Sequence, residues 1–92
     1  MKAKRKGSRN EHRSMALLQA SGYRCARSAA SLGPWDVICI GRRDFVLVQV
    51  KSNAWPGSVD LERLKGFPCP PNCRRLIHRW RDRVRMPDER EL

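Results

Sequence analysis

Two short apolar runs separated by a four-residue turn restrict the fold of this chain more than any other feature. Residues 35–40 and 45–50 are dense in Val, Ile and aromatic side chains, and Gly-Arg-Arg-Asp lies between them. This pattern predicts two β-strands joined as an antiparallel hairpin. Both faces of both strands are largely apolar, so we expect the hairpin to occupy the centre of a sheet that is covered on two sides.

A helix is predicted on the N-terminal side of this hairpin. Ser8 can cap its start, Gly22 fits its end, and apolar residues up to Leu18 recur at helical spacing. Glu11 lies on the same stripe as Leu18, so its carboxylate should point toward the core side. Residues 1–7 are polar and strongly charged. We expect them to form a flexible basic arm.

Three more strands and a second helix complete the predicted fold. Residues 23–28 alternate between polar and apolar side chains, as a short strand does, and a capped helix is expected at 58–66. Residues 74–86 fit one helix almost as well as two short strands around 81–83. We choose the strands, because a proline and a polar tail (87–92) follow. The expected architecture is α/β: a mixed β-sheet flanked by helices, in the order α-β-β-β-α-β-β.

The length of the chain allows one domain. Its 92 residues should bury about two-thirds of the surface that the unfolded chain exposes. No apolar run approaches the roughly 18 residues of a membrane span, and no signal-peptide pattern follows the basic start, so we expect a soluble cytoplasmic protein. The four cysteines are then expected to stay reduced, with Cys25 and Cys39 as core thiols. A zinc site at Cys69 and Cys73 is a weaker alternative, because their spacing is loose.

The chain is strongly basic. It carries 20 Lys and Arg residues against 9 Asp and Glu, a formal net charge of +11, and the positive residues gather in residues 2–13 and 74–85. Such clusters bind polyanions by releasing condensed counterions, and a planar guanidinium can hold two phosphate oxygens at once. Nucleic acid is therefore the expected partner. An acidic membrane surface, or a basic chain without such a partner, is the alternative.

Three polar residues interrupt the apolar hairpin and need an explanation. Asp36 stands near the start of the first strand, and Gln49 and Lys51 stand at the end of the second. If Gly41 pairs with Asp44 across the turn, Asp36 lies opposite Gln49. Because side chains alternate along a strand, all three polar side chains then share one face at one end of the hairpin.

A carboxylate, an amide oxygen and an ammonium group at one place suit a divalent cation and a phosphodiester. Mg²⁺ prefers oxygen ligands and keeps several waters, so one or two carboxylates with a carbonyl oxygen suffice. Such a metal acidifies a bound water, and Lys51 could orient that water or stabilise the phosphate. Glu11 is the candidate second carboxylate. The competing structural roles are a capping box between Glu11 and the Ser8 amide, a turn cap for Asp36 and a solvated strand end for Lys51.

The same residues resemble a known family. K-G-S-R-N-E at 6–11, Ser28, S-L-G-P-W-D-V-I at 31–38 and V-Q-V-K at 48–51 are similar in order and spacing to the motifs of the PD-(D/E)xK nuclease superfamily. Within it, the chain resembles archaeal-type Holliday junction resolvases and small phage-borne and VRR-type nuclease relatives. The resemblance covers a little over half of the chain, about residues 6–53.

The resemblance implies a metal-dependent endonuclease that cleaves branched DNA, with four-way junctions as the expected substrate. Glu11, Asp36, Gln49 and the Val50 carbonyl would hold Mg²⁺ or Mn²⁺, and Lys51 would act on the water or the phosphate. Resolvases of this kind are similar in being two-fold dimers, which suits a two-fold DNA substrate. Gln49 departs from the usual glutamate of the motif, although some restriction enzymes of the superfamily resemble this chain there.

The DNA-binding residues follow from charge and from the resemblance. The resemblance implies a serine-bearing loop beside the scissile phosphate, and Trp55 could stack on a base, or else anchor the core or a dimer. The expected set is Lys4, Arg5, Lys6, Ser8, Arg9, Arg13, Ser28, Ser31 and Trp55. Two other functions stay open: a nuclease of the same fold that acts on flaps, single strands or modified duplex, and a non-catalytic DNA-binding module.

Overall fold

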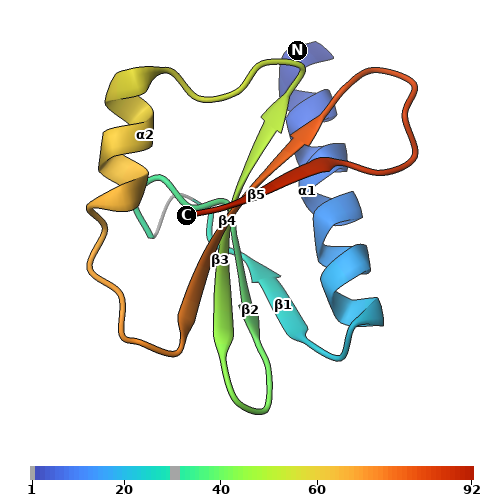
Figure 1. Ribbon diagram of the computed structural model, residues 1–92. Helices are drawn as coiled ribbons and strands as arrows, with labels where there is room; N and C mark the ends of the chain where they lie inside the picture. Colours follow the sequence, from blue (N-terminus) through green and yellow to red (C-terminus); the bar gives the residue numbers. More distant parts are fainter. Residues whose placement is uncertain (1, 30–31) are drawn as a thin grey trace.

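A computed structural model describes residues 2–29 and 32–92, with side chains described from Gly7 onward, and shows one sheet between two helices (Figure 1). The order α-β-β-β-α-β-β predicted from the sequence is confirmed. Its elements are α1 (Lys2–Ala20), β1 (Arg24–Arg27), β2 (Val37–Ile40), β3 (Phe45–Ser52), α2 (Ser58–Lys65), β4 (Cys73–Trp80) and β5 (Asp88–Glu91).

The five strands form one mixed sheet in the order β1-β2-β3-β4-β5. All neighbours are antiparallel except β3 and β4, which run parallel and are connected through α2. A parallel pair needs such a crossover, because its strands start at the same end of the sheet. The hairpin of β2 and β3 pairs Val37 with Val48 and Ile38 with Leu47, and Gly41 donates its amide to the Asp44 carbonyl at 2.8 Å. The predicted register is therefore confirmed.

Each face of the sheet carries its own apolar cluster, so the central strands are covered on both sides as predicted. On the α1 face, Val37, Val46 and Val48 are fully buried against Leu18. On the α2 face, Leu47 packs with three buried side chains, listed here with their exposed fractions: Trp35 1%, Leu64 0% and Ile77 0%. Figure 1 shows α1 and α2 on opposite sides of the sheet. Alternation along β3 therefore places residues 47, 49 and 51 on the α2 face.

Both helices start differently from the prediction. α1 begins at Lys2, so residues 2–7 are helical instead of forming a separate arm, and Ser8 lies inside the helix where it cannot be an N-cap. The run Lys-Ala-Lys-Arg-Lys before Gly7 consists of strong helix formers, which explains the longer helix. In α2 the N-cap is Gly57 without a side-chain bond, and Ser58 is the first helical residue. No helix in the described ranges is long and apolar enough to cross a bilayer.

The C-terminal residues form a strand instead of the predicted polar tail. β4 matches the first of the two short strands expected in residues 74–86, but the second strand, β5, starts only at Asp88. Ion pairs hold β5 on β4: Arg79 meets Asp88 at 2.6 Å and Arg74 meets Glu91 at 2.8 Å. These hydrogen-bonded pairs lower the pKa of both carboxyl groups. Much of the second arginine cluster is thus neutralised within the protein.

The cysteines are paired, which corrects the expectation of reduced thiols. Cys25 of β1 lies directly opposite Cys39 of β2, with a Cα–Cα distance of 4.0 Å, and the two form a disulfide. Cys69 and Cys73 form a second disulfide across the proline-containing loop before β4. The Cα atoms of Cys69 and Cys73 lie 5.8 Å apart, within the usual range for a disulfide. The zinc alternative is therefore wrong as well.

A buried polar network joins α1 to β4. The Ser14 hydroxyl accepts a hydrogen bond from Trp80 Nε1 at 2.9 Å and lies 2.8 Å from His78 Nδ1, while His78 Nε2 lies 2.9 Å from a Glu89 carboxylate oxygen. Ser14, His78 and Trp80 are almost fully buried. One set of protons satisfies every contact: Ser14 donates to Nδ1, and Nε2–H donates to Glu89. This network places α1, and therefore Glu11, relative to the sheet.

Candidate active site

Asp36 stands where β2 begins and interacts with β3 through both its backbone and its side chain. Its amide donates to the Val48 carbonyl at 2.9 Å, and its carboxylate Oδ2 accepts from the Val50 amide at 2.7 Å. The carboxylate thus takes the place of a backbone partner at the first position beyond the β2–β3 ladder. Because the amide and carbonyl of one strand residue point toward the same neighbouring strand, the Val50 carbonyl also points to the Asp36 side.

The surroundings of Asp36 raise the pKa of its carboxyl group. Burial is the largest cause, and the negative charge of Glu11 raises the pKa further. The hydrogen bond from Val50 and the positive charges of Lys51 and Arg27 act in the opposite direction but do not outweigh burial. Desolvation and a like charge both disfavour ionisation, so a cation placed here would relieve both.

Glu11 reaches the sheet from α1. Its Oε1 accepts a hydrogen bond from Arg27 Nε of β1 at 2.8 Å, and 19% of its side chain is exposed. The alternative capping box with Ser8 is therefore wrong, since Ser8 lies inside the helix and Glu11 contacts β1. Arg27 itself was not predicted as a site residue. Its only signal in the sequence was its position directly before Ser28.

Gln49 presents an unpartnered oxygen on the α2 face. Its Nε2 donates to the Pro34 carbonyl at 3.4 Å, which directs Oε1 away from that carbonyl. Oε1 is buried and has no hydrogen-bond partner in the described part of the chain. A buried amide oxygen without a partner costs free energy, about 1–3 kcal/mol for a typical polar group. A role in which Gln49 only satisfies backbone groups would account for its amide nitrogen but not for this oxygen.

Lys51 follows Gln49 on the same face of β3 and is half-buried. Within residues 7–29 and 32–92, no carboxylate lies within ion-pair distance of its ammonium group. Its charge nevertheless acts on Asp36, whose pKa it lowers. Lys51 therefore lies near the carboxylate without being neutralised by it, as a group that meets an incoming anion would.

The residues around Asp36 can supply oxygen ligands to a divalent cation. Asp36 and Glu11 each have one oxygen engaged in a hydrogen bond that the structure describes, and Gln49 Oε1 has none. No group of three His, Cys, Asp or Glu side chains able to hold a metal occurs in the described ranges. The predicted set is different in kind, because it uses two carboxylates, an amide oxygen and a backbone carbonyl. This donor set fits Mg²⁺ or Mn²⁺, which prefer oxygen ligands and keep bound water.

The fold is similar to that of a solved nuclease. Hjc, a Holliday junction resolvase from the archaeal hyperthermophile Archaeoglobus fulgidus, superimposes with a TM-score of 0.70 and 19% sequence identity, covering 95% of this chain and 71% of the Hjc chain. This chain therefore has the same fold as Hjc. No protein-family model and no curated protein matches the sequence. The likeness to Hjc therefore rests on the architecture of the chain.

Several residues predicted to bind DNA have structural partners in this nuclease fold. Ser28 is buried, its hydroxyl donates to the Trp35 carbonyl, and its amide donates to the Asp36 carbonyl at 2.9 Å. Ser28 thus supports the Asp36 segment, and its predicted contact with DNA stays a prediction. Trp55 packs against the α2-face cluster, and the Arg79 guanidinium lies 4.5 Å from its ring centre. This favours the core role for Trp55 over stacking on a base.

The remaining predicted DNA-binding residues lie mostly on α1. Arg9 is exposed, Ser8 is half-buried, and Arg13 is held by contacts with Val84 and Trp80. Ser31 lies outside the described residues. The first turns of α1 also contain Lys4, Arg5 and Lys6, whose side chains lie outside the described part of the chain.

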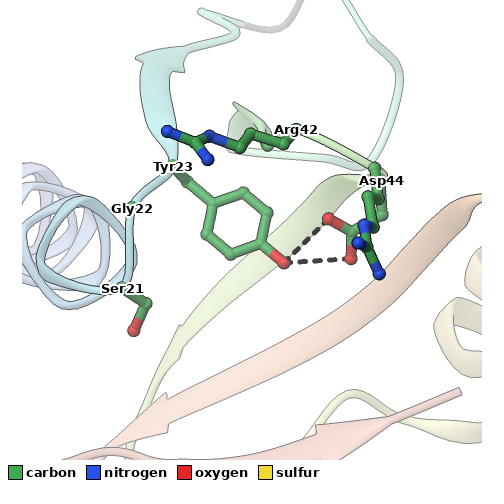
Figure 2. Close-up of a pocket in the computed structure, with 7 residues that line it drawn as sticks. Ser21, Gly22, Tyr23, Arg42 and Asp44 are labelled. Carbon is green, nitrogen blue, oxygen red and sulfur yellow. Dashed lines mark hydrogen bonds between the residues drawn. The ribbon is translucent and has the colours of Figure 1, made fainter.

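The pocket in Figure 2 lies at the opposite end of the hairpin from Asp36. Tyr23 donates its hydroxyl to both carboxylate oxygens of Asp44, at 3.0 and 2.9 Å. Gly41 is required here, because a Cβ at this position would lie 2.7 Å from the Tyr23 ring. Arg42 and Arg43 line the pocket and are exposed. The carboxylate of this pocket is already engaged by Tyr23, so the pocket lacks the free oxygen ligands found around Asp36.

Proposed function

We propose that this chain is a metal-dependent endonuclease that hydrolyses phosphodiester bonds in branched DNA, with four-way junctions as its substrate. The likeness to a solved resolvase supports the proposal through its fold, and the net charge of +11 supports a polyanionic substrate. The observation that carries the proposal is the buried, unpartnered Oε1 of Gln49, whose amide nitrogen bonds the Pro34 carbonyl two residues before Asp36. A bound metal ion would give this oxygen the partner that the described residues do not supply.

Glu11, Asp36, Gln49 Oε1 and the Val50 carbonyl would hold Mg²⁺ or Mn²⁺. When bound, such a metal acidifies a coordinated water and neutralises charge on the phosphate. The residues of the chain have separate tasks around it. The Val50 amide orients the Asp36 carboxylate, and Arg27 holds one oxygen of Glu11. Lys51 would place a positive charge beside the scissile phosphate, where negative charge increases in the transition state.

A four-way junction presents two related strands, so a two-fold dimer would place one site on each of them. We propose that the active form is a homodimer of this chain. Sedimentation equilibrium of the full chain, alone and with a junction, measures the oligomeric state directly. A single chain bound per junction would contradict the dimer without affecting the assignment of the catalytic residues.

The test of the nuclease is incubation of the pure chain with a strand-labelled four-way junction, in Mg²⁺ and in EDTA. We expect cleavage in Mg²⁺ only, with much less cleavage of a linear duplex of equal length. Asp36→Asn should abolish cleavage and retain DNA binding, because the amide still accepts from Val50 but lacks the charge that holds a cation. Asp60→Asn, an exposed carboxylate on α2, is the matched control and should cleave normally.

The uncharged Gln49 favours one alternative, a non-catalytic module that binds DNA with the same fold. That alternative predicts salt-sensitive binding without strand cleavage in either Mg²⁺ or Mn²⁺. Equal cleavage of the junction and the linear duplex would instead retain the nuclease and reject the resolvase. The three outcomes can be distinguished in one experiment, since binding and cleavage are measured on the same labelled DNA.

A further inference from the structure

Helix α1 presents different chemistry on its two flanks. Residues two positions apart lie about 200° apart around an α-helix, whereas residues four apart lie on the same side. Glu11 contacts Arg27 of β1 on one flank. Arg9 and Arg13 therefore share the other flank, where Arg13 contacts the segment that connects β4 to β5. The helix separates the candidate metal site from a second group of charged side chains.

The β4–β5 loop, residues 81–87, is held against this second flank. Arg13 Nη2 donates to the Val84 carbonyl at 2.6 Å, and its guanidinium lies 3.9 Å from the centre of the Trp80 ring. At the start of the loop, the Asp82 amide donates to Asn53 Oδ1 at 3.0 Å. Figure 1 shows the loop beside the N-terminal half of α1. The loop is thus positioned before any partner binds.

A surface depression lies between the loop and the helix, lined by Arg9, Arg13, Arg83 and Val84. Arg9 and Arg83 are exposed, and none of the described side chains places a carboxylate within ion-pair distance of either. Arg74 and Arg79 of β4 differ in this respect, because acids of β5 pair with them. Two arginines that line one depression, with no carboxylate of the described side chains within ion-pair distance, can bind an anion there.

We propose that Arg9 and Arg83 bind a backbone phosphate of the nucleic acid, with Arg13 holding the loop in place. The proposal deepens the proposed nuclease function and rests on it for the identity of the polyanion. The phosphate held here would lie across α1 from the candidate metal site, because Glu11 occupies the opposite flank of the helix.

The test compares two double variants with equal loss of charge. Arg9→Gln with Arg83→Gln removes the proposed site, and Arg42→Gln with Arg43→Gln removes two exposed arginines at the opposite end of the hairpin. Binding of a labelled four-way junction is measured by anisotropy in EDTA at several salt concentrations. Losing one phosphate contact lowers the slope of log affinity against log salt by about 0.9, which is about eightfold in affinity at 0.1 M salt.

We expect this loss for Arg9→Gln with Arg83→Gln and a clearly smaller one for the control pair. Equal changes in both pairs would overturn the proposal, because they would reflect net charge alone. Urea unfolding of both variants checks that neither has lost its fold. Vesicles containing phosphatidylserine provide a second arm: an effect on vesicle binding without an effect on junction binding would reassign the site to a membrane surface.

The metal-free readout separates this proposal from the nuclease assignment. If the slope falls as expected but the wild-type chain cleaves nothing in Mg²⁺, the phosphate site stands and the enzymatic function fails. If the wild-type chain cleaves the junction in Mg²⁺ and the two double variants bind alike, the enzymatic function stands and the phosphate site fails.

Discussion

Replacing Ser14 with alanine removes the hydroxyl that joins α1 to β4. Trp80 Nε1 and His78 Nδ1 would both lose their partner, and both residues are at most 2% exposed, so water cannot replace it. Each buried polar group left unpaired costs about 1–3 kcal/mol, and the gain in helix propensity returns about 0.5 kcal/mol. We expect the free energy of unfolding to fall by about 2–4 kcal/mol, which corresponds to a decrease in Tm of about 10–20 °C for a domain of this size.

Urea unfolding followed by circular dichroism measures this loss, with an unchanged slope against denaturant as evidence of an unchanged fold. Ser8→Ala on the same helix is the matched control and should change the free energy of unfolding by less than about 0.5 kcal/mol. Trp80→Phe removes the orphaned donor, so Ser14→Ala should cost about 1 kcal/mol less in that background. Strict additivity of the two substitutions would refute the reasoning, because the cost would then not arise from the unpaired nitrogen.

Two further predictions concern the candidate metal site. Burial raises the pKa of Asp36 in the folded chain above the ordinary carboxyl pKa of about 4. The stability that this carboxyl group contributes is therefore present below the ordinary pKa, and it is lost as pH rises through the pKa of the folded state. Asp36→Asn should therefore be more stable than wild type at pH 7 without metal, and urea unfolding at pH 4 should show a smaller difference; an equal difference at both pH values would contradict this. Gln49→Glu adds a charged oxygen ligand and should lower the Mg²⁺ concentration needed for half-maximal cleavage several-fold, and an unchanged Mg²⁺ titration would place Gln49 outside the metal site.

The centre of the fold could be predicted because it depends on local rules. The turn between Gly41 and Asp44 sets the hairpin register, and the predicted pairing holds up to Val37 and Val48. Asp36 stands just beyond the ladder and bonds β3 through its amide and its carboxylate, which the simple register did not predict. Apolar residues on both faces of the strands required a cover on each side, and α1 and α2 provide it. The position of Glu11 was predicted only to the extent that helical spacing turns it inward.

Contacts between distant segments could not be predicted in the same way. Glu11 and Arg27 are 16 residues apart and meet only once α1 has packed on the sheet. β5 has the low strand propensity of Asp-Glu-Arg-Glu, and it is held by contacts of its acids with Arg74, His78 and Arg79 of β4. The pairing of Cys25 with Cys39 follows from the register of β1 on β2, which the cysteine spacing does not reveal.

The acidic strand β5 also bears on how a large anion can dock. It contains three of the nine acidic residues of the chain, and each of them is already engaged with a side chain of β4. A polyanion that approached this edge would meet carboxylates first and would displace few counterions from the arginines behind them. The acids of β5 thus lower the positive charge along this edge of the sheet. We expect a bound DNA strand to lie away from this edge, which ends at Leu92.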